Sequence, residues 1–184
     1  MQKSIVHLVN ELSRLLLAFS PLVSQFERKQ PQALSALYLW LDDAEQLLSS
    51  YGLVASAELA GQRSKLSAPA LSDEHRGQLR KQQLRIAVDI LYPLQQCLQQ
   101  VLLPYQQKLQ QSTDLIRHLL SVISQSGALS YNPATGFDSF VQQLWQLIGQ
   151  HEQLKAGAVQ LRSWLAQADI MLLLAQETNP ADFP

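Results

Sequence analysis

The sequence contains little of what secreted proteins and many enzymes are built from. It has one cysteine, Cys97, among 184 residues, so no disulfide can form within the chain and a reducing compartment is indicated. Its seven glycines leave few positions for phosphate-binding loops or for the sharp turns that carry catalytic serines. Charged residues make up 16%, where about a quarter is usual. These shortages disfavour a disulfide framework and glycine-dependent catalysis.

Sheet and metal signals are missing as well. Aromatic and β-branched residues do not alternate with polar ones, so we expect no strand. None of the four histidines has a glutamate three residues before it, and the single cysteine cannot form a zinc cluster. We therefore expect no metal site, no cofactor and no catalysis. The net charge of −1 gives no general attraction for nucleic acid, which we disfavour as a partner.

The chain carries no clear targeting or membrane segment. Glu11 and Arg14 interrupt the apolar run at the N-terminus, which is therefore not typical of a secretory signal. The uncharged stretch of residues 90–107 contains six glutamines and two prolines and is too polar to span a bilayer. We expect a cytoplasmic protein that makes no membrane contact.

Apolar residues recur at intervals of three and four through most of the chain, as on one face of a helix. The spacing predicts a first helix over residues 2–19, which Ser20-Pro21 either kinks or follows with a short continuation to Arg28. Further helices are predicted over residues 31–51, 54–66 and 72–125, and a last long helix after residue 136. We expect an all-α fold with one domain over residues 1–184. Its architecture would be an antiparallel helical bundle of five to six helices, with a tail frayed from about residue 178.

Two prolines interrupt the stretch 72–125. Unbroken, this helix would extend about 80 Å, longer than a compact domain of this size accommodates. Proline also lacks the backbone N–H of a helix interior. We therefore predict proline-kinked long helices that bend at Pro93 or Pro104, with Pro104 the favoured start of a new helix, because proline is tolerated in a first turn.

The last predicted helix carries the strictest spacing, from Phe140 to Ala175. Thr135 to Asp138 resembles a capping box at its start. His151 occupies a position otherwise held by Leu, Phe or Ala, so we expect a core histidine satisfied by a neighbouring group. Gly149 and Gly157 inside the helix favour a bend or a close helix crossing.

The same segment offers one further interpretation. Residues 151–157 superficially resemble the phosphorylated-histidine segment of helical phosphotransfer modules, although the lysine and the glycine are displaced from that pattern. A histidine phosphotransfer-type module is therefore kept as an alternative.

The densest charge in the chain is basic and lies early in the stretch 72–125. It comprises Arg76, Arg80, Lys81 and Arg85. A solvated helix start is the ordinary interpretation of such a cluster. Basic side chains near a helix N-terminus oppose the helix dipole, however, so the cluster also favours an anion contact.

Low charge also suggests where the protein touches a partner. Apolar residues beside the main helix faces form a candidate interaction surface that a minimal bundle would leave partly uncovered: Leu102, Leu103, Val141, Trp145 and Ile148. A large exposed apolar patch is uncommon in monomers, and a second copy could cover it. We therefore expect a non-enzymatic adaptor or regulatory protein that binds another protein or itself, as a homodimer. The alternative is a ligand-sensing bundle with a pocket near His151 and Trp145.

Overall fold

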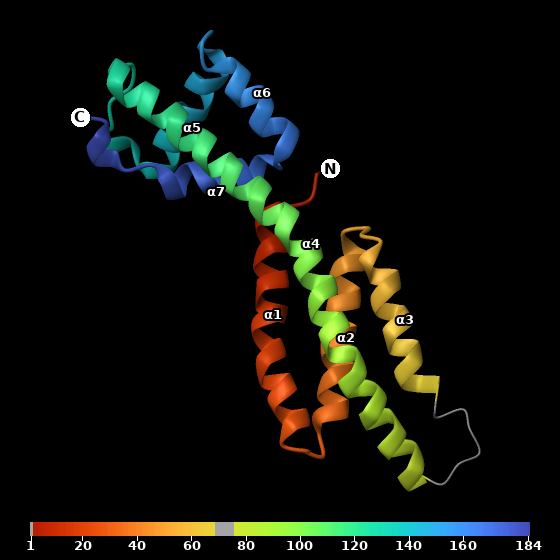
Figure 1. The fold of residues 1–184 in the computed structure, drawn as a ribbon. Coiled ribbons are helices and arrows are strands. Elements are labelled where there is room, and N and C mark those ends of the chain that lie inside the picture. The colour runs from red at the N-terminus through yellow and green to blue at the C-terminus, as the bar shows by residue number, and fades with distance from the viewer. Residues whose placement is uncertain (1, 69–75) are drawn as a thin grey trace. The chain divides into compact units, whose positions relative to one another are not determined.

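Every regular element in the described part of the chain is helical (Figure 1). The computed structural model describes residues 2–68 and 76–184, with residues 76 and 77 as backbone alone. Helices account for 83% of the structure, and the described residues contain no strand. The all-α prediction is confirmed.

Seven α-helices and two short 3-10 helices follow one another within residues 2–68 and 76–184. The α-helices are α1 (Ile5–Glu27), α2 (Ala33–Ser50), α3 (Ala55–Ser67), α4 (Arg76–Ser126), α5 (Phe137–Gln150), α6 (Lys155–Trp164) and α7 (Gln167–Glu177). The 3-10 helices are η2 (Pro133–Thr135) and η3 (Pro180–Asp182).

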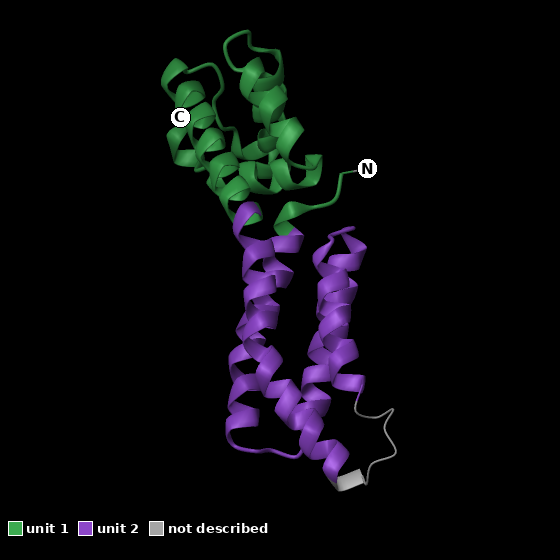
Figure 2. Cartoon of the chain, turned by 45° about the vertical axis from the view of Figure 1, so that its right-hand side comes forward, with its two compact units in different colours: residues 1–6, 105–184 green, residues 7–104 purple. Residues whose placement is uncertain are grey.

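The chain divides into two compact units, coloured separately in Figure 2. Unit 1 comprises residues 1–6 and 105–184, and unit 2 comprises residues 7–104. Both divisions fall inside helices, after Val6 in α1 and after Pro104 in α4. The single domain over the whole chain stays a prediction.

In unit 2, α1, α2, α3 and the first part of α4 lie side by side (Figures 1 and 2). The indole N–H of Trp40 in α2 donates to the Leu15 carbonyl of α1 at 2.9 Å, and its ring contacts Phe19 with centroids 4.9 Å apart. Arg63 of α3 bonds to two carboxylates of α2, those of Asp42 and Glu45. Burial lowers the pKa of Arg63 and the two carboxylates raise it, with a net upward shift.

In unit 1, α5 packs against both α6 and α7. Phe140 of α5 lies at the centre of an aromatic cluster, 5.1 Å from the ring of Tyr131 and 5.3 Å from that of Phe183. The Tyr131 N–H donates to the Phe183 carbonyl at 2.8 Å. The predicted frayed tail is therefore corrected, because Phe183 is 3% exposed and belongs to the core of unit 1.

The prediction of one continuous helix after residue 136 is wrong. The segment forms three helices, α5, α6 and α7, which end or begin at extended residues: His151 with ψ 127° and Leu165 with ψ 150°. Broken twice, the segment buries its apolar face among its own helices.

The start of α5 near residue 136 also differs from the prediction. α5 begins after Gly136, whose φ of 78° suits glycine. No side chain caps α5, so the predicted capping box from Thr135 to Asp138 does not form. Asn132 instead caps η2, accepting from the Ala134 N–H at 3.0 Å.

Helix α4 continues through both prolines, which lie inside it. A new helix therefore does not begin at Pro104, and that part of the prediction is wrong. The packing of α4 nevertheless changes there, because the division between the units falls after Pro104. The length of α4 is thus accommodated by two separate cores.

Among the described helices, α1 alone is long and apolar enough to cross a membrane, by length and composition only. Three of its side chains are charged, including those of Glu11 and Arg14. Leu8, Leu12 and Leu15 on its apolar face are at most 2% exposed.

A buried carboxylate holds the start of α1 within unit 1. Asp169, in the first turn of α7, is 2% exposed. Its oxygens accept from the Ile5 N–H at 2.7 Å, the Ser4 hydroxyl at 2.5 Å and, more weakly, the Val6 N–H at 3.4 Å. The first N–H groups of a helix have no partner within it, so Asp169 caps α1 from a distant part of the chain. Its burial is tolerated because these donors and the positive ends of α1 and α7 compensate its charge.

Replacing this carboxylate should destabilise the protein more than replacing its hydroxyl partner. We expect Asp169→Ala to lower the free energy of unfolding by about 2–3 kcal/mol, since a charged acceptor is lost and buried N–H groups lose their partner. Ser4→Ala should lower it by about 1 kcal/mol. Urea unfolding followed by circular dichroism measures both, and equal effects of the two variants would contradict the capping role.

Gly157 confirms the predicted close helix crossing. A Cβ atom at this position of α6 would lie 2.9 Å from Cδ2 of Leu119 in α4. Leu119 is 4% exposed and has little room to move. A Cβ atom at Gly61 in α3, by contrast, would have no neighbouring atom within 4 Å, which makes Gly61 a matched control.

We therefore expect a coupling between residues 157 and 119. In the native background, the crowding of Gly157→Ala should offset or exceed the gain of about 1 kcal/mol in helix propensity. In the Leu119→Ala background, and for Gly61→Ala alone, the same change should stabilise by about 1 kcal/mol. Chemical denaturation of the four-variant cycle tests this; equal effects of Gly157→Ala in both backgrounds would show that the crossing is not tight.

Candidate functional site

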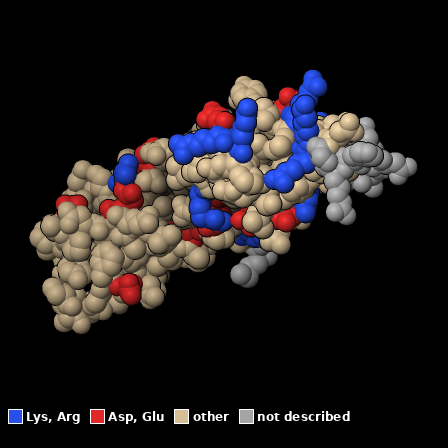
Figure 3. All heavy atoms as spheres, turned by 90° about the horizontal axis from the view of Figure 1, so that it is seen from below, with Lys and Arg blue, Asp and Glu red and all other residues tan. Residues whose placement is uncertain are grey.

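The basic residues predicted to contact an anion lie at one end of unit 2. Arg80, Lys81 and Arg85 are exposed on the first turns of α4, whereas the side chain of Arg76 lies outside the described residues. Lys29, in the connection between α1 and α2, lines the same cavity as Arg80 and Arg85. Figure 3 shows lysine and arginine side chains gathered over this end. The structure thus brings two residues of the predicted cluster, Arg80 and Arg85, together with one cation that the sequence analysis missed, Lys29.

Two adjoining cavities form a groove beside these cations. The first, of about 500 Å³, is lined by Phe26, Lys29, Gln30, Pro31, Ala33, Arg80, Leu84, Arg85 and Val88. The second, of about 440 Å³, is lined by Pro31, Leu34, Ser35, Tyr38, Leu79, Arg80 and Gln83. Pro31 and Arg80 belong to both. We call the two cavities together the basic-rimmed groove.

The floor of the groove is apolar. Phe26 is 8% exposed and Leu84 is half-buried, so both belong partly to the core of unit 2. Val88 is 55% exposed and forms the outer edge. Each volume lies within the range of about 300–1,000 Å³ that is usual for ligand pockets, so the groove can receive several apolar side chains.

The turn after α1 positions Lys29 on the rim. Its N–H donates to the Phe26 carbonyl at 3.0 Å, and the Gln30 N–H donates to the Gln25 carbonyl at 2.9 Å, a pattern that ends a helix. Lys29 has φ 52°, where glycine is the usual residue and other side chains are uncommon. A cation therefore occupies a position that backbone geometry alone would give to glycine.

The groove has an excess of positive charge. Arg80 donates from Nη2 to the Pro31 carbonyl at 2.9 Å, which fixes it between the two cavities. Neither cavity is lined by an acidic side chain. Within residues 2–68 and 76–184, no ion pair involves Lys29, Arg80, Lys81 or Arg85. An anionic group on a ligand would therefore meet cations that hold no carboxylate of the described chain.

Apart from its cations, the polar lining of the groove is uncharged. Its uncharged polar side chains are Gln30, Ser35, Tyr38 and Gln83, with no histidine or carboxylate to serve as a general base. Across the residues that the structure describes, no group of three His, Cys, Asp or Glu could hold a metal ion.

The candidate interaction surface is corrected. Four of its five residues are buried, with exposures of 7% for Leu102, 2% for Val141, 8% for Trp145 and 0% for Ile148. The breaks around α6 turn the helices of unit 1 back on α5 and cover the last three. Only Leu103 of the five, at 55% exposed, remains on the surface.

His151 is not a core residue, which corrects the prediction. It is exposed and follows α5, where its carbonyl accepts from the N–H groups of Leu154 and Lys155 at 3.0 and 2.9 Å. Trp145 is buried under the guanidinium of Arg162, 5.1 Å from its ring centroid. Neither His151 nor Trp145 lines the cavities of the groove.

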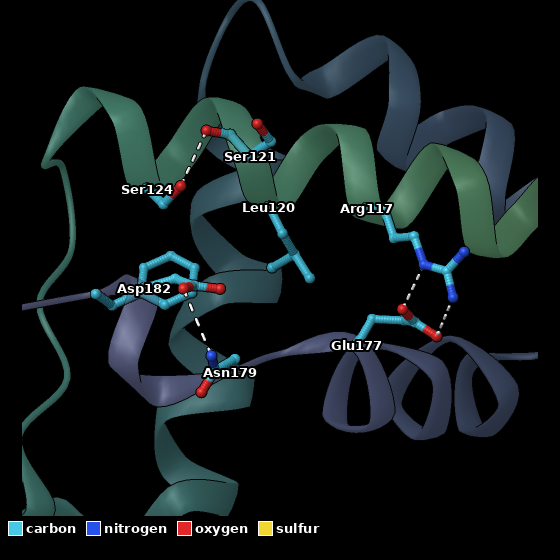
Figure 4. A pocket seen from close by; sticks show the side chains of 8 residues that line it. Arg117, Leu120, Ser121, Ser124, Glu177, Asn179 and Asp182 are labelled. Atoms are coloured by element: carbon cyan, nitrogen blue, oxygen red, sulfur yellow. Dashed lines mark hydrogen bonds and ion pairs between the residues drawn. The ribbon is translucent and has the colours of Figure 1, made fainter.

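A smaller polar cavity of about 260 Å³ lies in unit 1 (Figure 4). Its cation, Arg117, is already engaged by Glu177, with Nε to Oε2 at 2.6 Å and Nη2 to Oε1 at 3.2 Å. Hydrogen bonding to Glu177 raises the pKa of Arg117. Because this ion pair satisfies both side chains, the cavity offers less to an anion than the basic-rimmed groove does.

Comparisons with family models, with curated proteins and with solved structures give no match to this chain.

The single cysteine is set back in the core of unit 2. Cys97 is 4% exposed, and its Sγ lies 3.5 Å from Oε2 of Glu58. Burial, and then the nearby carboxylate, raise the pKa of the Cys97 thiol to about 11. The neutral thiol therefore predominates at physiological pH, and a nucleophilic role is disfavoured.

We expect Cys97 to resist alkylation in the folded protein. At pH 8 its raised pKa and its burial should make iodoacetamide labelling at least about a hundredfold slower than in the urea-unfolded chain, where the pKa returns to about 8.5. Mass spectrometry of timed samples measures the two rates. Glu58→Gln should accelerate labelling, because the carboxylate that raises the pKa of the Cys97 thiol is then removed. Comparable labelling rates in the folded and the unfolded protein would contradict the burial of the thiol.

Proposed function

We propose that this protein is a non-enzymatic adaptor that binds another protein through the basic-rimmed groove of unit 2. The observation that supports this proposal most is the combination of an apolar floor with cations that form no ion pair with a carboxylate of the described residues. A partner segment with apolar and acidic side chains is complementary to both features.

The groove also favours a protein over a small molecule. Together the two cavities extend from Val88 at one edge to Tyr38 at the other, with Arg80 between them. A chain segment can place separate side chains in both cavities, whereas a compact ligand fills one. The ligand-sensing alternative lacks the support it expected from an internal pocket beside His151 and Trp145.

The predicted antiparallel bundle and the predicted bend of α4 at its prolines are part of this proposal, because both would serve an adaptor. In an antiparallel bundle, the helices of unit 2 would hold both walls of the groove rigid. A bend of α4 at its prolines would let that helix serve two cores. Self-association, if it occurs, would involve Leu103 and not the four buried residues. The cytoplasm remains the proposed location.

The exposure of His151 supports the phosphotransfer alternative in one respect, since a partner could reach the side chain. The displaced lysine and glycine still count against it. In addition, His151 has extended backbone angles beyond the end of α5, and does not project from a helix face.

Position 88 should crosslink to a partner protein. We expect a photoreactive phenylalanine analogue in place of Val88 to give a specific crosslinked product in the native host, because Val88 edges the groove. Val159 of α6 is the matched control, since it is 58% exposed against 55% for Val88. Gel shift and mass spectrometry identify the product.

A product at position 88 that is absent at position 159, and that disappears with Arg80→Glu and Arg85→Glu, supports the proposal. Equal products at both positions, a product formed only with a second copy of this chain, or none at all would overturn it.

A further inference from the structure

An exposed stripe of α4 leads away from the basic-rimmed groove. At about 100° per residue, one face of about 80° contains Lys81, Arg85, Val88, Tyr92, Gln96, Gln99 and Leu103. Val88, Tyr92 and Leu103 are 55%, 69% and 55% exposed. All of these residues belong to unit 2, and Figure 1 shows the helix that carries them. We call this face the α4 stripe.

The chemistry of the α4 stripe changes in one direction. It begins with two cations, Lys81 and Arg85, continues with the apolar pair Val88 and Tyr92, and ends in uncharged glutamines and Leu103. Val88 and Tyr92 are four positions apart, about one helical turn, so their side chains are adjacent on the helix surface. Val88 belongs to both the stripe and the groove, which makes the two surfaces continuous.

The absence of a sheet edge in the described residues decides what kind of segment fits. An extended peptide leaves its backbone N–H and C=O groups in need of partners, which it usually finds on an edge strand. Here the surface is formed by helix side chains, and the described residues provide no strand. A helix satisfies its own backbone groups and presents apolar residues at the three–four spacing that packs along another helix.

The same stripe of a second copy does not complement the basic end of the α4 stripe. In a parallel pair, Lys81 and Arg85 would meet the same cations of the other copy. In an antiparallel pair they would meet Gln99 and Leu103, which offer no negative charge. Acidic residues on the occupant remove both difficulties.

Resting on the proposed function, we propose that the occupant is an amphipathic α-helix of another protein, with acidic residues at one end. Its acidic end lies over Lys29, Lys81 and Arg85, and its apolar face packs on Val88, Tyr92 and Leu103. Lys81 and Leu103 are 22 positions apart, which corresponds to about 33 Å of helix. A segment of about six turns therefore covers the stripe.

Designed peptides of 22 residues test this with the full chain. The first has leucines at three–four spacing and glutamates confined to its first two turns. The second has the same composition in an order that scatters the leucines. In the third, lysine replaces each glutamate, and in the fourth, two central prolines block the helix. Fluorescence anisotropy of labelled peptides gives each Kd, at low and at raised salt.

We expect the first peptide to bind with a Kd on the order of 10 µM and the other three at least about tenfold more weakly. Raised salt should weaken the first peptide severalfold. Arg85→Glu should weaken it about tenfold and strengthen the lysine peptide, whereas Lys155→Glu on α6 should change neither. Both substituted residues are exposed, and circular dichroism checks that each variant is folded.

The outcomes separate this inference from the proposed function. Equal binding of the proline and helical peptides overturns the helical occupant, while the groove keeps its binding role. No binding by the first peptide, with a specific crosslink at position 88, also overturns the helix and leaves the adaptor function standing. Loss of the crosslink overturns both. Stronger binding to vesicles containing phosphatidylserine than to the first peptide would assign the stripe to a membrane surface instead.

Discussion

The burial of α4 is the constraint on which the rest of the fold depends. Its 51 residues carry one apolar face along two units, and no single small core can cover a face of that length. Before the division at Pro104 the face is covered within unit 2, where Leu94 and Leu98 are fully buried. After it, Ile116 and Ile123 are fully buried within unit 1. The remaining α-helices fall into two groups: α1, α2 and α3 pack with the first part of α4 in unit 2, and α5, α6 and α7 pack with its last part in unit 1.

Local periodicity was sufficient to predict which residues are helical, but not how far each helix continues. The ends of α2 and α3 differ from the predicted ends by one or two residues, and those of α2 are marked chemically by Pro31 and Gly52. Between Phe140 and Ala175 the spacing is the same whether one long helix packs on another chain or three helices pack on each other. That ambiguity explains why His151 was predicted to be buried, and why Val141, Trp145 and Ile148 were predicted to be partly uncovered.

The candidate site was predictable only in part for a related reason. The sequence shows that Arg80, Lys81 and Arg85 are close together, since they share the first turns of one helix. It does not show that Lys29 and Phe26 approach them, because that proximity depends on packing across some fifty residues of chain. A left-handed lysine gives no distinctive local signal either, since glycine would be the expected residue in that turn.

Several cations elsewhere in both units are already paired: in unit 2, Arg63 bonds to Asp42 and Glu45. In unit 1, Arg117 is engaged by Glu177 and Arg162 lies over the ring of Trp145, so these cations already stabilise the fold. The cations of the basic-rimmed groove have no such carboxylate among the described residues, and basic charge in the first turns of α4 opposes its dipole. The left-handed backbone conformation of Lys29 would be better served by glycine. These two features disfavour local stability, and they support the proposal of a partner with anionic groups.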